Sequence, residues 1–155
     1  MKYAFLGKGG SGKSTLATAL TLHFANSGYA TLAIDADHNM DLTYNLGIEP
    51  TVFLGTDPDN IKEYVGVSRN DTFALARNHA ELNNITFSIS PVDAFTNSMS
   101  VRSGDFLRIM TAGPHTPSVR MQESCSHSLA APLKVYLPRL QLSENQRVVI
   151  DERAG

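Results

Sequence analysis

The sequence predicts a three-layer α/β domain with a mainly parallel sheet. Short apolar runs end in glycine or aspartate, and a stretch with helical spacing lies between the first two runs. A glycine-rich segment joins the first run to this helical stretch. Together these segments make one βαβ unit. Groups that follow the strands of such a sheet gather at its carboxyl edge, so we expect the functional site there.

The first βαβ unit occupies the start of the chain. Residues 2–6 form a short apolar run that stops at Gly7 and predict a buried strand. Residues 13–27 have leucine, alanine and phenylalanine at helical spacing, and Gly28 lies where a helix commonly ends. Residues 31–34 are apolar and partly β-branched, and they predict the second strand.

The pattern is weaker in the middle of the chain. Residues 38–104 mix polar clusters with short apolar pieces such as residues 85–89. Residues 106–110 predict another strand, which Gly113 and Pro114 stop.

The last part of the chain predicts a helix and a strand. Residues 128–142 have leucines at near-helical spacing, but Pro132 and Pro138 lack amide donors, so we expect a kinked or interrupted helix. Residues 147–151 are β-branched and predict a buried strand with Asp151 at its carboxyl end.

Composition limits the class of protein. The 155 residues are 42% hydrophobic and 18% charged, which excludes a disordered or collagen-like chain and suits one domain with a real core. Thirteen basic against fifteen acidic residues give a net charge of -2, so we expect no nucleic-acid partner. The single cysteine cannot form an internal disulfide, and no apolar run is long enough to span a membrane. We therefore expect a cytoplasmic protein.

A phosphate-binding motif follows the first predicted strand. Residues 7–14 match G-x-x-x-x-G-K-[ST] at every position and lie between a strand and a helix, which is the context that the motif requires. Backbone amides of such a loop bind a polyphosphate, a lysine reaches the β- and γ-phosphates, and a hydroxyl group takes one Mg²⁺ position. The residues expected to bind the triphosphate of a nucleotide are Gly9, Gly10, Ser11, Gly12, Lys13, Ser14 and Thr15, with Ser14 on Mg²⁺ and Thr15 towards the α-phosphate.

Two carboxylates follow predicted strands beside this loop. Asp37 comes just after the second strand and Asp151 ends the last one. A carboxylate in this place either positions the attacking water or ligates Mg²⁺ through water, and we assign Mg²⁺ to Ser14 and Asp151. The alternative is a solvated loop acid or a helix cap.

A second lysine in the loop extends the motif. Lys8 follows the first glycine, and the string Lys-Gly-Gly-x-Gly-Lys-Ser resembles the deviant Walker A motif of the MinD, ParA and nitrogenase iron protein family of P-loop ATPases. Residues 35–41 resemble the first switch of that family, D-x-D-P-x-x-D, with His38 where proline often occurs. Residues 148–151 resemble its Walker B strand, and Gly155 falls in the second switch.

This resemblance implies roles for individual residues. Asp37 would orient the attacking water, and Asp41 would follow the γ-phosphate. Lys8 would cross a two-fold dimer interface to the nucleotide of the partner. Lys8, Lys13 and Asp37 are then the expected catalytic residues of an ATPase that binds ATP and ADP and dimerises with nucleotide.

One branch of the family is especially similar. Cys125-Ser126-His127 precedes a leucine-rich stretch, as a C-x-C pair precedes a helix in the CooC-type ATPases that assist nickel insertion into carbon monoxide dehydrogenase. The resemblance implies that Cys125 and His127 of two chains share a Ni²⁺ or Zn²⁺ site and that a nickel enzyme is the partner. The alternative is a lone structural cysteine beside an unrelated histidine.

Family members continue beyond the second switch, so we expect residues 1–155 to be the N-terminal portion of a longer nucleotide-binding domain. A shortened chain, a truncated reading frame and a natural short variant all agree with an end at Gly155. Two other functions remain open: a partitioning or positioning ATPase of the ParA and MinD kind, and a regulatory fragment that binds nucleotide without hydrolysing it.

Overall fold

The structure is a computed structural model and describes residues 1–114 and 130–152. Its centre is a five-stranded sheet with the strand order β1-β7-β2-β5-β4. Four strands run parallel, and β4 lies antiparallel to β5 at one edge. The strands are β1 (Lys2–Phe5), β2 (Ala30–Asp35), β4 (Val101–Ser103), β5 (Leu107–Thr111) and β7 (Gln146–Asp151).

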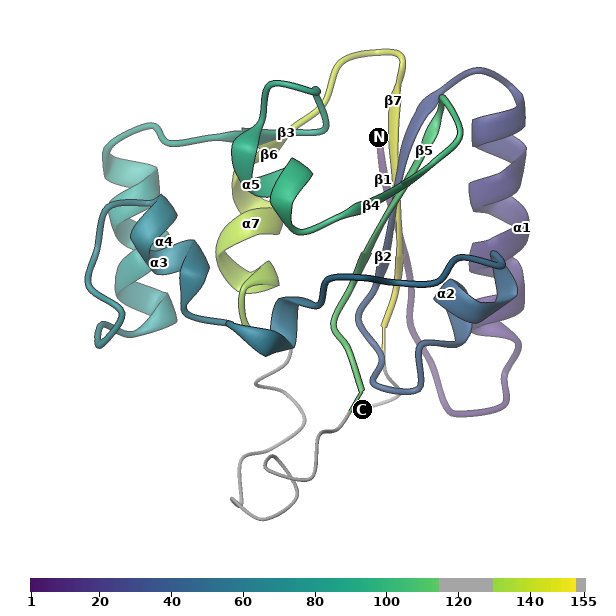
Figure 1. The fold of residues 1–155 in the computed structure, drawn as a ribbon, viewed down its shortest axis with the longest axis horizontal. Helices are drawn as coiled ribbons and strands as arrows, with labels where there is room; N and C mark the ends of the chain where they lie inside the picture. Colours follow the sequence, from purple (N-terminus) through teal and green to yellow (C-terminus); the bar gives the residue numbers. More distant parts are fainter. Residues whose placement is uncertain (115–129, 153–155) are drawn as a thin grey trace.

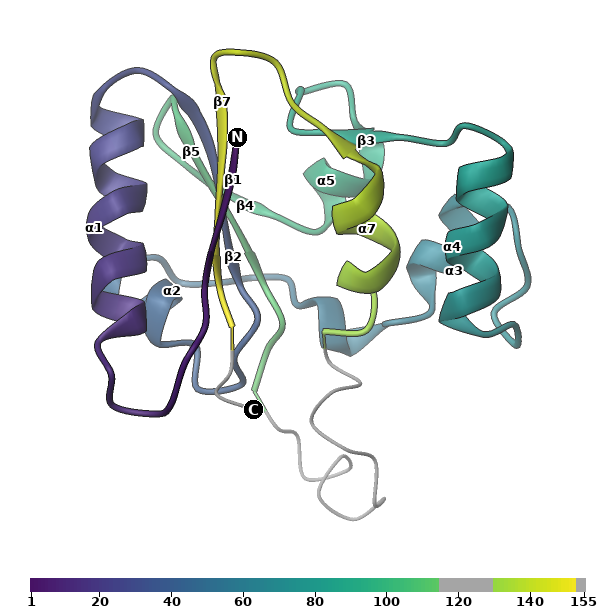
Figure 2. The ribbon, with the colours of Figure 1, turned by 180° about the vertical axis from the view of Figure 1, so that it is seen from behind.

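Helices cover both faces of this sheet, which gives three layers (Figure 1). One face carries α1 (Lys13–Asn26) and α2 (Asp41–Asn45), and the opposite face carries α5 (Ala94–Ser98) and α7 (Leu133–Arg139). The view from behind brings β1 to the front and shows α7 beside it (Figure 2).

A smaller outer unit extends the α7 face. It contains the short helix η1 (Leu54–Thr56), α3 (Asn60–Tyr64) and α4 (Phe73–Leu82), and α4 packs on α7. A second sheet of two parallel strands, β3 (Phe87–Ser88) and β6 (Leu140–Gln141), joins this part to the end of α7.

The core consists of two hydrophobic clusters separated by the sheet. Leu32 and Ile34 of β2 belong to the cluster on the α7 face together with Tyr136, whereas Ala33 belongs to the cluster on the α1 face together with Phe24. Successive side chains of a strand point to opposite faces, and both faces are covered here. This arrangement explains why the strand reads as a continuous apolar run rather than an alternating one.

The structure confirms the predicted fold class and the order of strand, helix and strand in the first βαβ unit. The first strand is not buried as predicted, because β1 lies at an edge of the described sheet and its residues are exposed or half-buried. Helix α1 ends at Asn26, and Gly28 has φ of 81°, the left-handed conformation that suits glycine after a helix. The last predicted strand is β7, which ends at Asp151 as expected.

The predicted helix over residues 128–142 is shorter than expected. Helix α7 spans Leu133–Arg139, and Pro132 caps its start instead of interrupting it, because the first turn of a helix does not use that amide. Pro138 lies in the last turn, where the chain leaves the helix and enters β6. Residues 128 and 129 lie outside the described residues.

One other strand prediction is shifted, and one apolar piece contains a short strand that was not predicted. The strand expected over residues 106–110 is β5, one residue later, and the side chain of Phe106 is exposed before it. Of the apolar piece at residues 85–89, only Phe87–Ser88 forms a strand. Within the described ranges, no helix has the length and apolar character needed to cross a lipid bilayer.

Candidate functional site

Four strand ends form a row along the carboxyl edge of the sheet. The register places Phe5 beside Asp151, Asp151 beside Asp35 and Asp35 beside Thr111. The glycine-rich loop leaves β1 directly after Phe5, so the loop begins next to Asp151. Parallel strands thus bring the loop and two carboxylates, far apart in sequence, to one place.

The glycine-rich loop is shaped by its own backbone. The amide of Ser11 donates to the carbonyl of Lys8 at 3.3 Å, and Gly12 caps helix α1 in the left-handed conformation, with φ of 80°. A Cβ atom at Gly12 would meet no neighbour within 4 Å, so the backbone conformation requires glycine here and crowding does not. The 14-residue helix α1 starts at the next residue and points its free amides at the loop.

Lys13 is the cation at the start of this helix. Its Nζ atom donates a hydrogen bond of 3.0 Å to the carbonyl oxygen of Lys8. The side chain therefore folds back over the loop, and phosphate oxygens can replace the carbonyl as acceptors.

A hollow of about 650 Å³ lies between the loop and the segment that follows β2. Its lining carries one lysine, two aspartates and several amide and hydroxyl groups, which suits a charged ligand with many acceptor oxygens. The lining residues are Gly9, Gly10, Gly12, Lys13, Ser14, Thr15, Asp37, His38, Asn39, Asp41 and Asn45.

Most residues predicted to bind phosphate come together in this hollow, but three do not line it. Lys8 and Ser11 are exposed but do not line the hollow, and Asp151 is buried. Cys125 and His127, the predicted ligands of a shared metal, lie outside the described residues, as does Gly155. Among residues 1–114 and 130–152, no cluster of three or more His, Cys, Asp or Glu side chains could hold a metal ion.

Asp151 lies where a cation would complete the site. Burial raises the pKa of its carboxyl group, while a hydrogen bond from the Ser14 hydroxyl and the charge of Lys13 oppose that change. Its Oδ1 atom is buried and has no hydrogen-bond partner in the described part of the chain. A hydroxyl oxygen beside an unpaired carboxylate oxygen suits Mg²⁺, which prefers oxygen ligands, so the residues present fit this ion.

Asp37 is held at the rim of the hollow. Its Oδ1 atom accepts a hydrogen bond of 3.1 Å from the amide of Asn39, and the Nδ1 atom of His38 lies 3.0 Å from the same oxygen. The side chains of Asp37 and His38 are 18% and 23% exposed, so this carboxylate remains accessible from the hollow.

Asp35 anchors the segment that carries these residues. Its Oδ2 atom accepts hydrogen bonds of 2.8 Å from both the amide and the hydroxyl of Thr43, and its Oδ1 atom accepts one of 3.3 Å from the amide of Asp37. The hydroxyl of Thr43 also lies 3.2 Å from that of Thr111. When Asp35 is ionised, Thr43 donates to Asp35, so Thr111 must donate to Thr43.

Burial destabilises the ionised form of Asp35. The residue is fully buried, and this desolvation raises its pKa to about 6, although the hydrogen bonds from Thr43 and from the amide of Asp37 oppose the rise. The charge of Asp151 contributes to the rise. A buried carboxylate kept in place by three donors fixes helix α2 and the rim of the hollow to the sheet.

Sequence reasoning missed several residues of this site. Asn39 and Asn45 line the hollow, and Asn45 follows Asp41 by four residues, which places both on one side of α2. That spacing was a usable signal. No sequence pattern indicates Thr43 and Thr111, because their contact joins positions 68 residues apart.

A parallel sheet with a strand, a glycine-rich loop and a helix at its carboxyl edge defines a nucleotide-binding domain of the phosphate-loop class. Comparison with known families agrees. The chain belongs to the family described as the CobQ/CobB/MinD/ParA nucleotide-binding domain, whose model matches residues 4–133. This match does not distinguish the nickel-insertion branch from the others.

Two curated relatives come from Methanocaldococcus jannaschii. The chain is 29% identical over 164 residues to the uncharacterized ATP-binding protein MJ0084 and 27% identical over 157 residues to the uncharacterized ATP-binding protein MJ0823. Each match covers all of this chain but only 59% and 55% of the respective relative. The chain thus spans a little over half the length of these relatives.

A solved structure is also similar. The crystal structure of the chimerical protein CapA2B2 matches with 18% identity and a TM-score of 0.47, over 99% of this chain and 52% of that one.

The Asp35 anchor predicts an order of stability among threonine variants. Thr43→Val removes a hydroxyl that donates to a buried carboxylate, so we expect it to lower the free energy of unfolding by about 2 kcal/mol in urea titrations. Thr43→Ser keeps the donor and should lose less. The matched control Thr18→Val removes a hydroxyl bound only to the Ser14 carbonyl and should change stability by less than about 0.5 kcal/mol. Equal losses for Thr43→Val and Thr18→Val would contradict the anchor.

Proposed function

We propose that this chain is a Mg²⁺-dependent switch protein that binds and hydrolyses ATP as a nucleotide-linked dimer. The observation that carries the proposal is the glycine-rich loop with Lys13 at its end, beside the half-buried Ser14 and the buried Asp151. The loop supplies amides and a cation for a triphosphate, and the pair supplies oxygen ligands for Mg²⁺.

Two further facts favour ATP and its hydrolysis. Both curated relatives carry the description ATP-binding. Asp37 lies at the rim of the same hollow as Lys13, where a carboxylate can hold a water molecule for in-line attack on the γ-phosphorus. In that step the water oxygen bonds to phosphorus as the bond to the bridging oxygen of ADP breaks, and both protons of the water stay on the phosphate that leaves as H₂PO₄⁻. Lys13 and the loop amides would stabilise the charge that spreads over the phosphoryl oxygens, and Mg²⁺ held by Ser14 and Asp151 would supply further positive charge there.

Removal of the Lys13 ammonium tests the loop assignment. Lys13→Ala should weaken Mg²⁺·ATP binding by about 100-fold in calorimetry. The reason is that the triphosphate loses the charged hydrogen-bond donor that Lys13 supplies. The matched control is Lys134→Ala, an exposed lysine on α7 away from the hollow, and it should bind ATP as the wild type does. An affinity of Lys13→Ala within twofold of the wild type would refute phosphate binding at this loop.

Dimerisation rests on Lys8. Its side chain is exposed and does not line the hollow of its own chain, although its carbonyl oxygen accepts the hydrogen bond from Lys13. An exposed cation next to a phosphate site can reach the nucleotide of a second chain, as the deviant Walker A resemblance implies. The charge of two triphosphates facing each other requires such compensation.

The role of Lys8 can be separated from that of Lys13. We expect Lys8→Ala to bind Mg²⁺·ATP within about threefold of the wild type but to lose the nucleotide-dependent dimer in sedimentation, because the missing charge acts on the partner. Lys8→Arg should keep the dimer. Unchanged sedimentation of Lys8→Ala with ATP would rule out a crossing lysine.

The finer role that we propose is assistance to nickel insertion into a metalloenzyme. It rests on the order Cys125-Ser126-His127 before a leucine-rich stretch, which resembles the CooC-type ATPases. A thiolate and an imidazole from each of two chains give four ligands that suit Ni²⁺ or Zn²⁺. Carbon monoxide dehydrogenase or a related nickel enzyme is the corresponding partner.

Elemental analysis tests this finer role. The purified ATP-bound dimer should contain about one Ni or Zn atom per two chains, because the two-fold axis makes one site from two ligand pairs. Cys125→Ser should lose the metal and keep ATP binding, which separates the metal site from the nucleotide site. A metal-free dimer that is insensitive to Cys125→Ser would exclude a shared site.

A further inference from the structure

We propose that His38 is a positioning residue for Asp37: its imidazole fixes the carboxylate that holds the attacking water. This inference rests on the proposed hydrolysis of ATP and names a residue that the phosphate-loop motif does not include.

The contact between the two side chains is the first observation. The Nδ1 atom of His38 lies 3.0 Å from Oδ1 of Asp37, and both residues line the hollow. When the imidazole is protonated, its charge attracts the carboxylate oxygen at this separation, and the attraction is stronger than in water because both side chains are mostly buried.

The second observation is that the two carboxylate oxygens of Asp37 differ in their contacts. Oδ1 has both contacts, one with His38 and one with the amide of Asn39 at 3.1 Å. Within residues 1–114 and 130–152, no hydrogen bond reaches Oδ2. One oxygen is thus held by the protein while the other is left for a ligand, as a water-orienting carboxylate requires.

The third observation is the turn that carries both residues. The amide of Met40 donates to the carbonyl of Asp37 at 3.2 Å, and Met40 itself has φ of 56°. The amide of Asp37 is tied in turn to Asp35 in the sheet. The backbone is therefore fixed on both sides, and the remaining freedom of Asp37 is the rotation of its carboxylate, which the Asn39 amide and the imidazole restrict together.

A proline, common here in the resembling family, cannot make this contact because its ring has no polar atom. The imidazole is thus a feature of this chain. Misplacement of a reacting group by about 1 Å can lower a rate by about 100-fold, so the orientation of one carboxylate matters.

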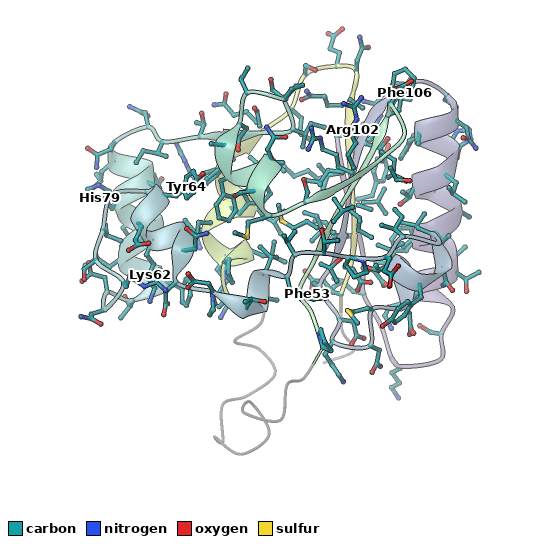
Figure 3. The ribbon with its side chains drawn as sticks, in the orientation of Figure 1. Phe53, Lys62, Tyr64, His79, Arg102 and Phe106 are labelled. Atoms are coloured by element: carbon teal, nitrogen blue, oxygen red, sulfur yellow. The ribbon has the colours of Figure 1, made fainter. Side chains whose placement is uncertain are left out.

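The test compares binding with turnover. His38→Ala should lower the single-turnover rate of ATP hydrolysis about tenfold and leave the Kd for Mg²⁺·ATP within about threefold, because the triphosphate contacts are unchanged. His38→Asn should recover most of the rate, since its amide NH₂ group reaches the position of Nδ1. The matched control is His79→Ala, on α4 far from α1 and the loop (Figure 3), and it should match the wild type.

A double-mutant cycle decides whether His38 acts through Asp37. In an Asp37→Asn background, His38→Ala should cause no further loss of rate, because the carboxylate that it positions is gone. Multiplicative losses, or an unchanged rate of His38→Ala beside an active wild type, would overturn this inference alone. A wild-type chain that binds Mg²⁺·ATP but never hydrolyses it would overturn the proposed hydrolysis and this inference together.

Discussion

The hydrogen bonds that Asp35 accepts from Thr43 and Asp37 are the constraint on which the rest of the site depends. They join the carboxyl end of β2 to helix α2 and to the turn between them. A fully buried carboxylate is stable only with such donors, so the turn cannot shift without leaving a charge unpaired. The sheet edge therefore sets the position of Asp37 and Asp41 relative to the phosphate loop.

Two neighbouring carboxylates have different surroundings at this edge. Asp35 has its oxygens satisfied by protein donors, whereas Asp151 keeps one buried oxygen without a partner in the described part of the chain. The protein thus uses one acid as a structural anchor and leaves the other able to accept a cation. Burial raises the pKa of both groups, and a bound divalent ion would stabilise the charged form of Asp151.

Local patterns were sufficient to predict the elements that place the loop. Helix α1, the strands β2 and β7 and the phosphate motif follow from spacing and composition over a few residues. The contacts of Thr43 with Thr111 and the parallel pair β3 and β6 could not be predicted, because they join segments distant in sequence. The start of helix α7 was predicted wrongly because a proline at the start of a helix is tolerated, whereas a proline inside a helix interrupts it. The contact of His38 with Asp37 depends on a turn that the motif alone does not describe.

The position of β1 has a consequence for the order of folding. In the described part of the chain, β1 pairs with β7 alone, so the first strand waits for residues about 145 positions later before it gains a neighbour. Contacts over such long separations form late, since loop closure precedes any gain from pairing. The phosphate loop follows β1, so we expect it to be among the last parts to reach its native shape. Nucleotide binding would then indicate that β1 has paired with β7.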